Sequence, residues 1–224
     1  MTLSDVGVTV KPIFDGGTLL LADSDQSNLA FLVRSAGGTI TAPETGSAEL
    51  SGVLSGDGAL TFNGDATTVI TGANTYSGGT TVSSGTLQGD ATSLQGNIVN
   101  NSNIVFNQAG SGTYASVISG TGSLTKDGSG TLTLSGVNTY TGNTTVSDGT
   151  LKLGVAGAVP TGALTIGATG TFYLNNFNQA VTDLSGAGGI TLGSATLTAG
   201  AGTDTTFSGM ISAVHSPAAA SVTR

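Results

Sequence analysis

The sequence predicts an all-β fold, a β-solenoid in which short strands and tight corners repeat along the chain. Three observations predict it. One segment of the sequence recurs after 64 residues, apolar and polar residues alternate over short runs, and equivalent apolar positions recur every 20–22 residues. Each coil of a solenoid contacts only its neighbours, so a regular short period favours this architecture over a β-sandwich.

The recurring segment is the clearest evidence for an array. Residues 53–87 and 117–151 align without a gap and share about 20 of their 35 residues. The most similar part reads GANTYSGGTTVSSGTL from Gly72 and GVNTYTGNTTVSDGTL from Gly136, and a weaker copy, LSGAGGITL, begins at Leu184. We infer that equivalent coils need the same core residues and the same corners.

Short alternating runs predict half-buried strands. In residues 128–136, Leu132 and Leu134 alternate with threonine and serine, and residues 148–154 place Leu151 and Leu153 in the same way. Threonine and valine favour a pleated backbone, while Asp-Gly, Ser-Gly and Gly-Gly pairs favour tight corners. No segment has a helical period, so no helix is expected. Stacked Thr and Asn side chains are expected on the outside, in ladders between coils.

A column of apolar side chains is expected inside the coils. A coil of 20–22 residues suits three short strands and three corners, stacked on the next coil at about 4.8 Å. Each fully buried side chain of the column contributes about 1.5–3 kcal/mol. The expected core positions are Leu60, Val82, Ile104, Leu124, Val146 and Ile166.

The composition agrees with a folded repeat protein. Only 8% of the 224 residues are charged, against about a quarter in ordinary domains, and 37 residues are glycine. Hydrophobic residues nevertheless make up 38% and follow a period, which a disordered chain does not need. The net charge is −8, with five Lys and Arg in total and no basic run, which argues against nucleic acid or an anionic membrane as partner.

The repeat resembles a known family. Residues Gly120–Leu151, GTGSLTKDGSGTLTLSGVNTYTGNTTVSDGTL, resemble the autotransporter-associated β-strand repeat, a unit of passenger domains in bacterial type V secretion. Residues Gly56–Leu87 are less similar, with Phe62 in place of Lys126. The resemblance implies a right-handed parallel β-helix, exported across two membranes and either displayed on a Gram-negative cell surface or secreted. It names no ligand, because such passengers include adhesins, self-aggregating proteins and toxins.

We expect three regions along the chain. Residues 1–45 should form N-terminal coils or a cap, residues 46–212 the repeat-containing β-helix, and residues 213–224 a disordered tail or a vector-derived end. The start, MTLSDVGVTV, lacks the basic residues and long apolar core of a signal peptide, and no apolar run is long enough for a membrane helix. We therefore expect a fragment that does not insert into membranes, with the signal peptide and a covalently attached translocator barrel outside this sequence.

No residue pattern predicts a catalytic, cofactor-binding or metal site, and no enzyme activity is expected. The single histidine, His215, lies in the expected tail, and there is no cysteine. Asp23 and Asp25 form the one close acidic pair, for which a solvated loop is favoured over a weak cation site. Four further acids adjoin a glycine, as corner residues do: Asp57, Asp65, Asp127 and Asp148.

Tyr76 and Tyr140 occupy equivalent places in an N-T-Y motif. They could form an aromatic ladder that binds sugar or protein. The favoured interpretation is that each ring packs over a corner, because a framework position recurs with the fold whereas a specific site need occur only once. Ligand specificity should then lie in the unrepeated segments, which are Leu21–Arg34, Gly89–Gly110 and Phe172–Val181.

The favoured function is that of an autotransporter passenger acting as an adhesin. Its surface would bind a host cell-surface protein or glycan, or mediate self-association between bacteria. One alternative is a stalk that presents a distal module. A polysaccharide-active enzyme would require carboxylates from different coils to converge, and an ice-binding array would require regular T-x-T on one flat face.

Overall fold

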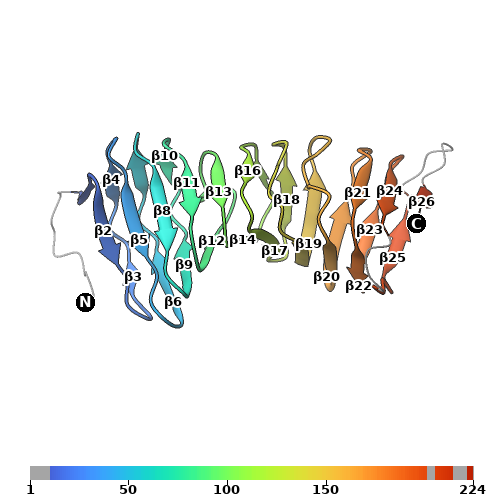
Figure 1. Cartoon of the computed structure of the whole chain (residues 1–224), viewed down its shortest axis with the longest axis horizontal. Helices are drawn as coiled ribbons and strands as arrows, with labels where there is room; N and C mark the ends of the chain where they lie inside the picture. The colour runs from blue at the N-terminus through green and yellow to red at the C-terminus, as the bar shows by residue number, and fades with distance from the viewer. Residues whose placement is uncertain (1–10, 201–204, 214–220, 224) are drawn as a thin grey trace. The chain divides into compact units, whose positions relative to one another are not determined.

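The computed structural model describes residues 11–200, 205–213 and 221–223, and these residues form strands, turns and bends without a helix. Two compact units are present, Met1–Val105 and Phe106–Arg224 (Figure 1). Among the described residues, no helix has the length and hydropathy needed to cross a bilayer. The expected region boundaries at residues 45 and 212 stay predictions.

The first unit is a stack of parallel coils whose strands form three sheets. The strand orders are β1-β4-β7-β10, β2-β5-β8-β11-β13 and β3-β6-β9-β12, and the pairs are parallel. Figure 1 shows β2, β5 and β8 side by side. The strands are β1 (Ile13–Phe14), β2 (Gly17–Leu20), β3 (Gln26–Ser27), β4 (Phe31–Val33), β5 (Gly38–Thr41), β6 (Ser47–Leu50), β7 (Leu54–Gly56), β8 (Leu60–Asn63), β9 (Thr67–Ile70), β10 (Thr75–Tyr76), β11 (Thr80–Val82), β12 (Thr86–Gly89) and β13 (Ile98–Asn100); β14 (Asn103–Asn107) contains the boundary to the second unit.

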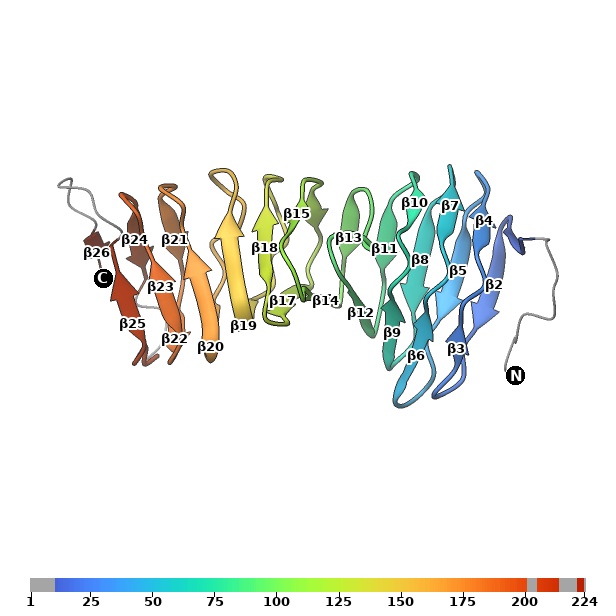
Figure 2. The ribbon, with the colours of Figure 1, turned by 180° about the vertical axis from the view of Figure 1, so that it is seen from behind.

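The second unit repeats this construction with two long strands. β19 and β20 have ten residues each and pair with one another in parallel, and β19 pairs with β17 through its first half and with β18 through its second (Figure 2). A separate sheet has the order β21-β24-β26. The strands are β15 (Gly112–Tyr114), β16 (Ile118–Ser119), β17 (Ser123–Asp127), β18 (Thr131–Leu134), β19 (Thr144–Leu153), β20 (Leu164–Tyr173), β21 (Gln179–Val181), β22 (Leu184–Gly186), β23 (Gly189–Thr191), β24 (Thr196–Ala199), β25 (Met210–Ser212) and β26 (Ser221–Thr223).

The parallel β-solenoid and the inward position of the six expected core residues are confirmed, since all six are 0% exposed. The expected equivalence of Val146 and Ile166 is confirmed, but the pairing of Val82 and of Val146 with the preceding coil differs by two residues from the expected one. Val82 stacks on Phe62 and not on Leu60, which stacks on Thr80. Side chains two residues apart in a strand share a face, so the shift leaves burial unchanged.

The length of a coil also varies more than expected. Paired positions lie 18 residues apart at Thr80 and Ile98, 20 apart at Leu124 and Thr144, and 23 apart at Gln26 and Glu49. The corners differ in length from coil to coil, while the strands keep their register. Outward threonines stack across coils as expected, at Thr18, Thr39, Thr61 and Thr81.

Glycines set two features of the repeated corners. Gly85 and Gly149, which are equivalent in the two copies, have φ of 68° and 62°, a region that residues with a side chain rarely adopt. Gly136 serves a different purpose, because its backbone lies against the previous coil. A Cβ atom at Gly136 would collide with the carbonyl group of Ser116. Successive coils can therefore approach each other closely only where this position is glycine.

We predict that Gly136→Ala destabilises the second unit by about 1–3 kcal/mol, because the added methyl group forces the two coils apart. Gly110→Ala is the matched control, since nothing lies within 4 Å of a Cβ atom there, and should change stability by less than about 0.5 kcal/mol. Urea unfolding followed by circular dichroism measures both. Equal midpoints for the two variants would contradict the close-approach argument.

Candidate functional site

The tyrosines of the N-T-Y motif point into the solenoid. Tyr76 is 2% exposed and Tyr140 is 1% exposed. The Tyr76 hydroxyl shares a hydrogen bond of 2.6 Å with Thr80 Oγ1, and Tyr140 shares one of 2.7 Å with Thr144 Oγ1. Burial raises the pKa of both hydroxyls, and the threonine hydrogen bonds act in the opposite direction. The rings are thus framework groups, and an aromatic ladder open to sugars is wrong.

The asparagine of the same motif links successive coils. The Leu54 N–H donates to Asn74 Oδ1 at 2.8 Å, and Asn74 Nδ2 donates to the Ser93 carbonyl at 2.8 Å. Buried backbone groups that lack a strand partner need another one, and a carboxamide supplies both an acceptor and donors. Asn74 is 4% exposed, so the expectation that stacked asparagines lie outside is wrong here.

The second copy repeats this link. Asn138 is 5% exposed. Its Oδ1 accepts from the Ile118 N–H at 2.7 Å, and its Nδ2 donates to the Ala158 carbonyl at 2.6 Å. The two copies therefore use the same side chain, at the same place, to bond a backbone N–H of the coil before and a backbone carbonyl of the coil after.

Lys126 is a buried cation in the core, with 0% of its surface exposed. Its Nζ donates to the carbonyl oxygens of Asp127, Gly128 and Asp148 at 2.9, 2.7 and 3.0 Å, so each ammonium N–H has a partner. Burial lowers the pKa of Lys126, while the carboxylates of Asp148 and Asp127 act in the opposite direction. Phe62 fills the equivalent place in the first copy and is 2% exposed.

The acidic pair of the first unit stabilises its own loop. Asp23 Oδ1 accepts from the Ser47 N–H at 3.2 Å, and Asp25 Oδ2 accepts from the Ala22 N–H at 2.7 Å. Such hydrogen bonds are those expected of aspartates in turns. Within the described part of the chain, no three His, Cys, Asp or Glu residues form a group that could hold a metal ion. His215 lies outside the described residues.

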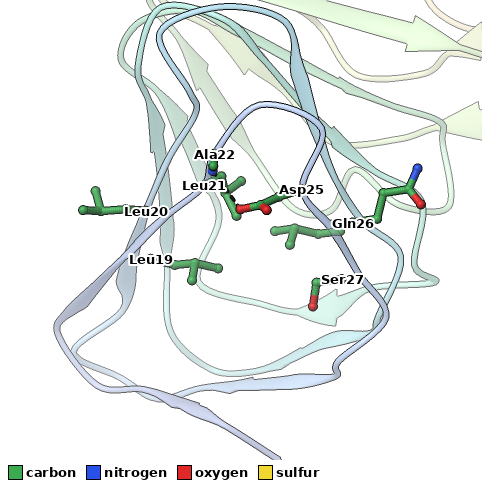
Figure 3. A pocket seen from close by; sticks show the side chains of 8 residues that line it. Leu19, Leu20, Leu21, Ala22, Asp25, Gln26 and Ser27 are labelled. Carbon is green, nitrogen blue, oxygen red and sulfur yellow. Dashed lines mark hydrogen bonds between the residues drawn. The ribbon is translucent and has the colours of Figure 1, made fainter. Parts of the chain in front are cut away.

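A mainly apolar pocket of about 280 Å³ is lined by the first described coil and by Leu50 of the next one (Figure 3). In the close-up, Leu20 is directed away from Asp25, whose carboxylate is bonded to the Ala22 N–H. The pocket thus offers apolar contact and one carboxylate that is already engaged, which is too little for catalysis. It is lined by Leu19, Leu20, Leu21, Ala22, Asp25, Gln26, Ser27 and Leu50.

The unrepeated segment Phe172–Val181 places one aromatic ring on the outside. Phe172 and Leu174 are 0% exposed, so Tyr173 between them faces outward, and it is the one tyrosine of four that is not buried. Tyr173 pairs with Lys152 of β19 on one side and with Thr191 of β23 on the other. Lys152 Nζ lies 5.3 Å from the centre of the Tyr173 ring.

The other two unrepeated segments show no comparable group. Leu21–Arg34 contributes to the apolar pocket and to strands β3 and β4. Gly89–Gly110 runs across the boundary between the units. Within its first-unit part, Val99 is 42% exposed and Asn100 is buried. The candidate surface is therefore the outward face around Lys152 and Tyr173.

Comparison with known proteins identifies the repeat. The family model of the passenger-associated-transport-repeat matches residues 53–88 and 124–153. The chain is also 38% identical, over 168 residues, to the adhesin BmaC autotransporter of Brucella suis biovar 1 (strain 1330). The chain carries the repeats of an autotransporter passenger.

The comparison with the Brucella protein covers 72% of this passenger sequence but 5% of the relative, so the chain spans about one twentieth of the relative's length. No solved structure matches the passenger. The matched repeats contain both N-T-Y motifs and Lys126. Lys152 lies near the end of the second matched segment, whereas Tyr173 lies outside both.

We predict that Asn138→Ala destabilises the passenger by about 2–4 kcal/mol, because the Ile118 N–H and the Ala158 carbonyl lose their buried partner. Asn143→Ala, at an exposed asparagine of the same repeat, is the control and should change stability by less than about 0.5 kcal/mol. Denaturant unfolding compares the two variants. A loss at Asn138 no larger than that at Asn143 would show that the asparagine link is dispensable.

We predict that Lys126→Ala costs about 2–4 kcal/mol, since three charge-assisted hydrogen bonds are removed from the interior. Lys126→Phe should recover part of this loss, because Phe62 already occupies the equivalent place. The control is Lys152→Ala, which removes an outward lysine. Thermal unfolding of the three variants tests this expected order of stability. A Lys126→Ala variant as stable as the parent chain would contradict it.

Proposed function

We propose that this passenger acts as an adhesin at the bacterial surface or after secretion. Its partner would be a host cell-surface protein or glycan, or another bacterium that carries the same passenger. The similar Brucella protein is named an adhesin, which supports this proposal. The distribution of side chains supports it independently.

The observation that carries the proposal is the separation between repeated and unrepeated positions. The repeated polar side chains, Asn74, Asn138, Tyr76 and Tyr140, are buried and bonded within the coils. The outward aromatic residue, Tyr173, falls in an unrepeated segment. A scaffold of repeats that presents distinct residues on its outer face is suited to recognition by surface contact.

A role without catalysis belongs to the same proposal. Asp23 and Asp25 accept backbone N–H groups, and the one fully buried cation, among the described residues, donates to carbonyl oxygens. These groups are used to hold corners in place. A polysaccharide-active enzyme would instead need carboxylates free to transfer protons.

A stalk that presents a distal module is the second candidate. The observation that favours it is that the motif asparagines of both matched repeats bond to the next coil. A stalk would need no ligand of its own, so binding distinguishes it from an adhesin.

We predict that the purified, labelled passenger binds saturably to host epithelial cells or to bacteria that display it. Unlabelled passenger should compete, and an unrelated β-helix of similar net charge is the control. Binding to host cells indicates a host receptor, and binding to the displaying bacteria indicates self-association. Binding at the level of the control on both would leave the stalk as the function of this segment.

A further inference from the structure

The pair formed by Lys152 and Tyr173 differs from every other lysine and tyrosine of the second unit. Lys126, Tyr114 and Tyr140 are buried, with at most 3% of their surface exposed. Lys152 and Tyr173 are only half-buried and lie next to each other on the outward face of β19 and β20. Their separation of 5.3 Å is that of a cation held over an aromatic ring.

Apart from their contact with each other, both groups can bind a ligand. Lys152 forms no ion pair with any residue that the structure describes, and the Tyr173 hydroxyl has no hydrogen-bond partner in the same set. Asp148, the acid on the same strand, lies on the other side of the Gly149 corner, and no ion pair joins it to Lys152 among the described residues. The ammonium group is therefore not neutralised within its own strand.

Hydroxyl groups surround the pair. Thr133 and Thr191 continue its row on the neighbouring strands, and Thr150 and Thr171 form the adjacent row on the same face. Neighbouring strands, and therefore neighbouring side chains within one row, are about 4.8 Å apart, which is close to the length of one pyranose ring. The surface thus combines an aromatic face, one cation and regularly spaced hydroxyls.

We propose that this surface binds an anionic sugar chain, and this inference rests on the adhesin function proposed above. A sugar ring stacks its C–H face on Tyr173, and its carboxylate or sulfate accepts a charge-assisted hydrogen bond from Lys152. The threonine hydroxyls on both sides bond to the neighbouring sugar units. The chain lies across the strands, along the row from Thr133 to Thr191.

The net charge of −8 does not exclude an anionic ligand. At physiological ionic strength the Debye length is about 8 Å, so distant carboxylates are largely screened. The local cation then determines the interaction at this face. Binding should weaken as salt is added, because the ion pair is exposed to solvent.

Two substitutions test the site with little risk to the fold. Lys152→Gln introduces the residue that occupies the equivalent place in the first copy, Gln88. Tyr173→Thr introduces the residue type found beside it in the same row, at Thr191. Arg34→Gln is the charge-matched control, since Arg34 belongs to the first unit and its side chain is 54% exposed.

The experiment is isothermal titration calorimetry with three hexasaccharides: a galacturonate oligomer, a sulfated heparin fragment and neutral maltohexaose. We expect the anionic sugars to bind more tightly than the neutral one, and their relative affinities distinguish carboxylate from sulfate. Lys152→Gln and Tyr173→Thr should each raise the Kd about fivefold, while Arg34→Gln leaves it unchanged.

Three results would overturn the proposal: no binding of either anionic hexasaccharide, equal binding of the neutral one, or unchanged affinity in both site variants. Cell binding by the same proteins separates this proposal from the proposed function. If Lys152→Gln and Tyr173→Thr bind cells as the parent chain does, the adhesin function stands and the glycan site fails. If the parent chain itself binds no cells, the adhesin function fails.

Discussion

Parallel hydrogen bonding between successive coils is the constraint on which the two units depend. Each strand pairs in register with the coil before and the coil after, so a side chain that faces inward on one coil stacks on inward side chains of its neighbours. The core therefore becomes a set of columns, and corners must return the chain to the same register. Close approach at Gly136 and left-handed corners at Gly85 and Gly149 meet this requirement.

Corners create a second requirement, because they leave buried backbone groups outside the regular strand pairing. Asn74 and Asn138 satisfy such groups on two neighbouring coils at once, and Lys126 satisfies three carbonyls at the corners of two successive coils. Buried polar groups of this kind are costly when unpaired and stabilising when every donor and acceptor has a partner. The recurrence of N-T-Y follows from this requirement and not from a ligand.

Alternation and spacing were enough to predict the strands, the solenoid and the six buried core positions, since burial follows from period alone. Register was less predictable: Leu60 and Val82 both face inward, yet they stack on Thr80 and Phe62. A buried Lys126 could not be anticipated, because lysines are mostly exposed. The juxtaposition of Lys152 with Tyr173 also depends on the register between coils, and neither residue belongs to a motif that sequence alone would join.

The central claim is that repeated residues build the scaffold and unrepeated outward residues carry recognition. An alanine scan over the second unit that records thermal stability and cell binding for every variant tests it most directly. The account predicts that variants at inward repeated positions lose stability. Variants that lose binding while keeping their stability should cluster at outward positions whose residue differs between the two copies or lies outside them. Binding that falls only in proportion to lost stability, with no outward position affecting it alone, would contradict the claim.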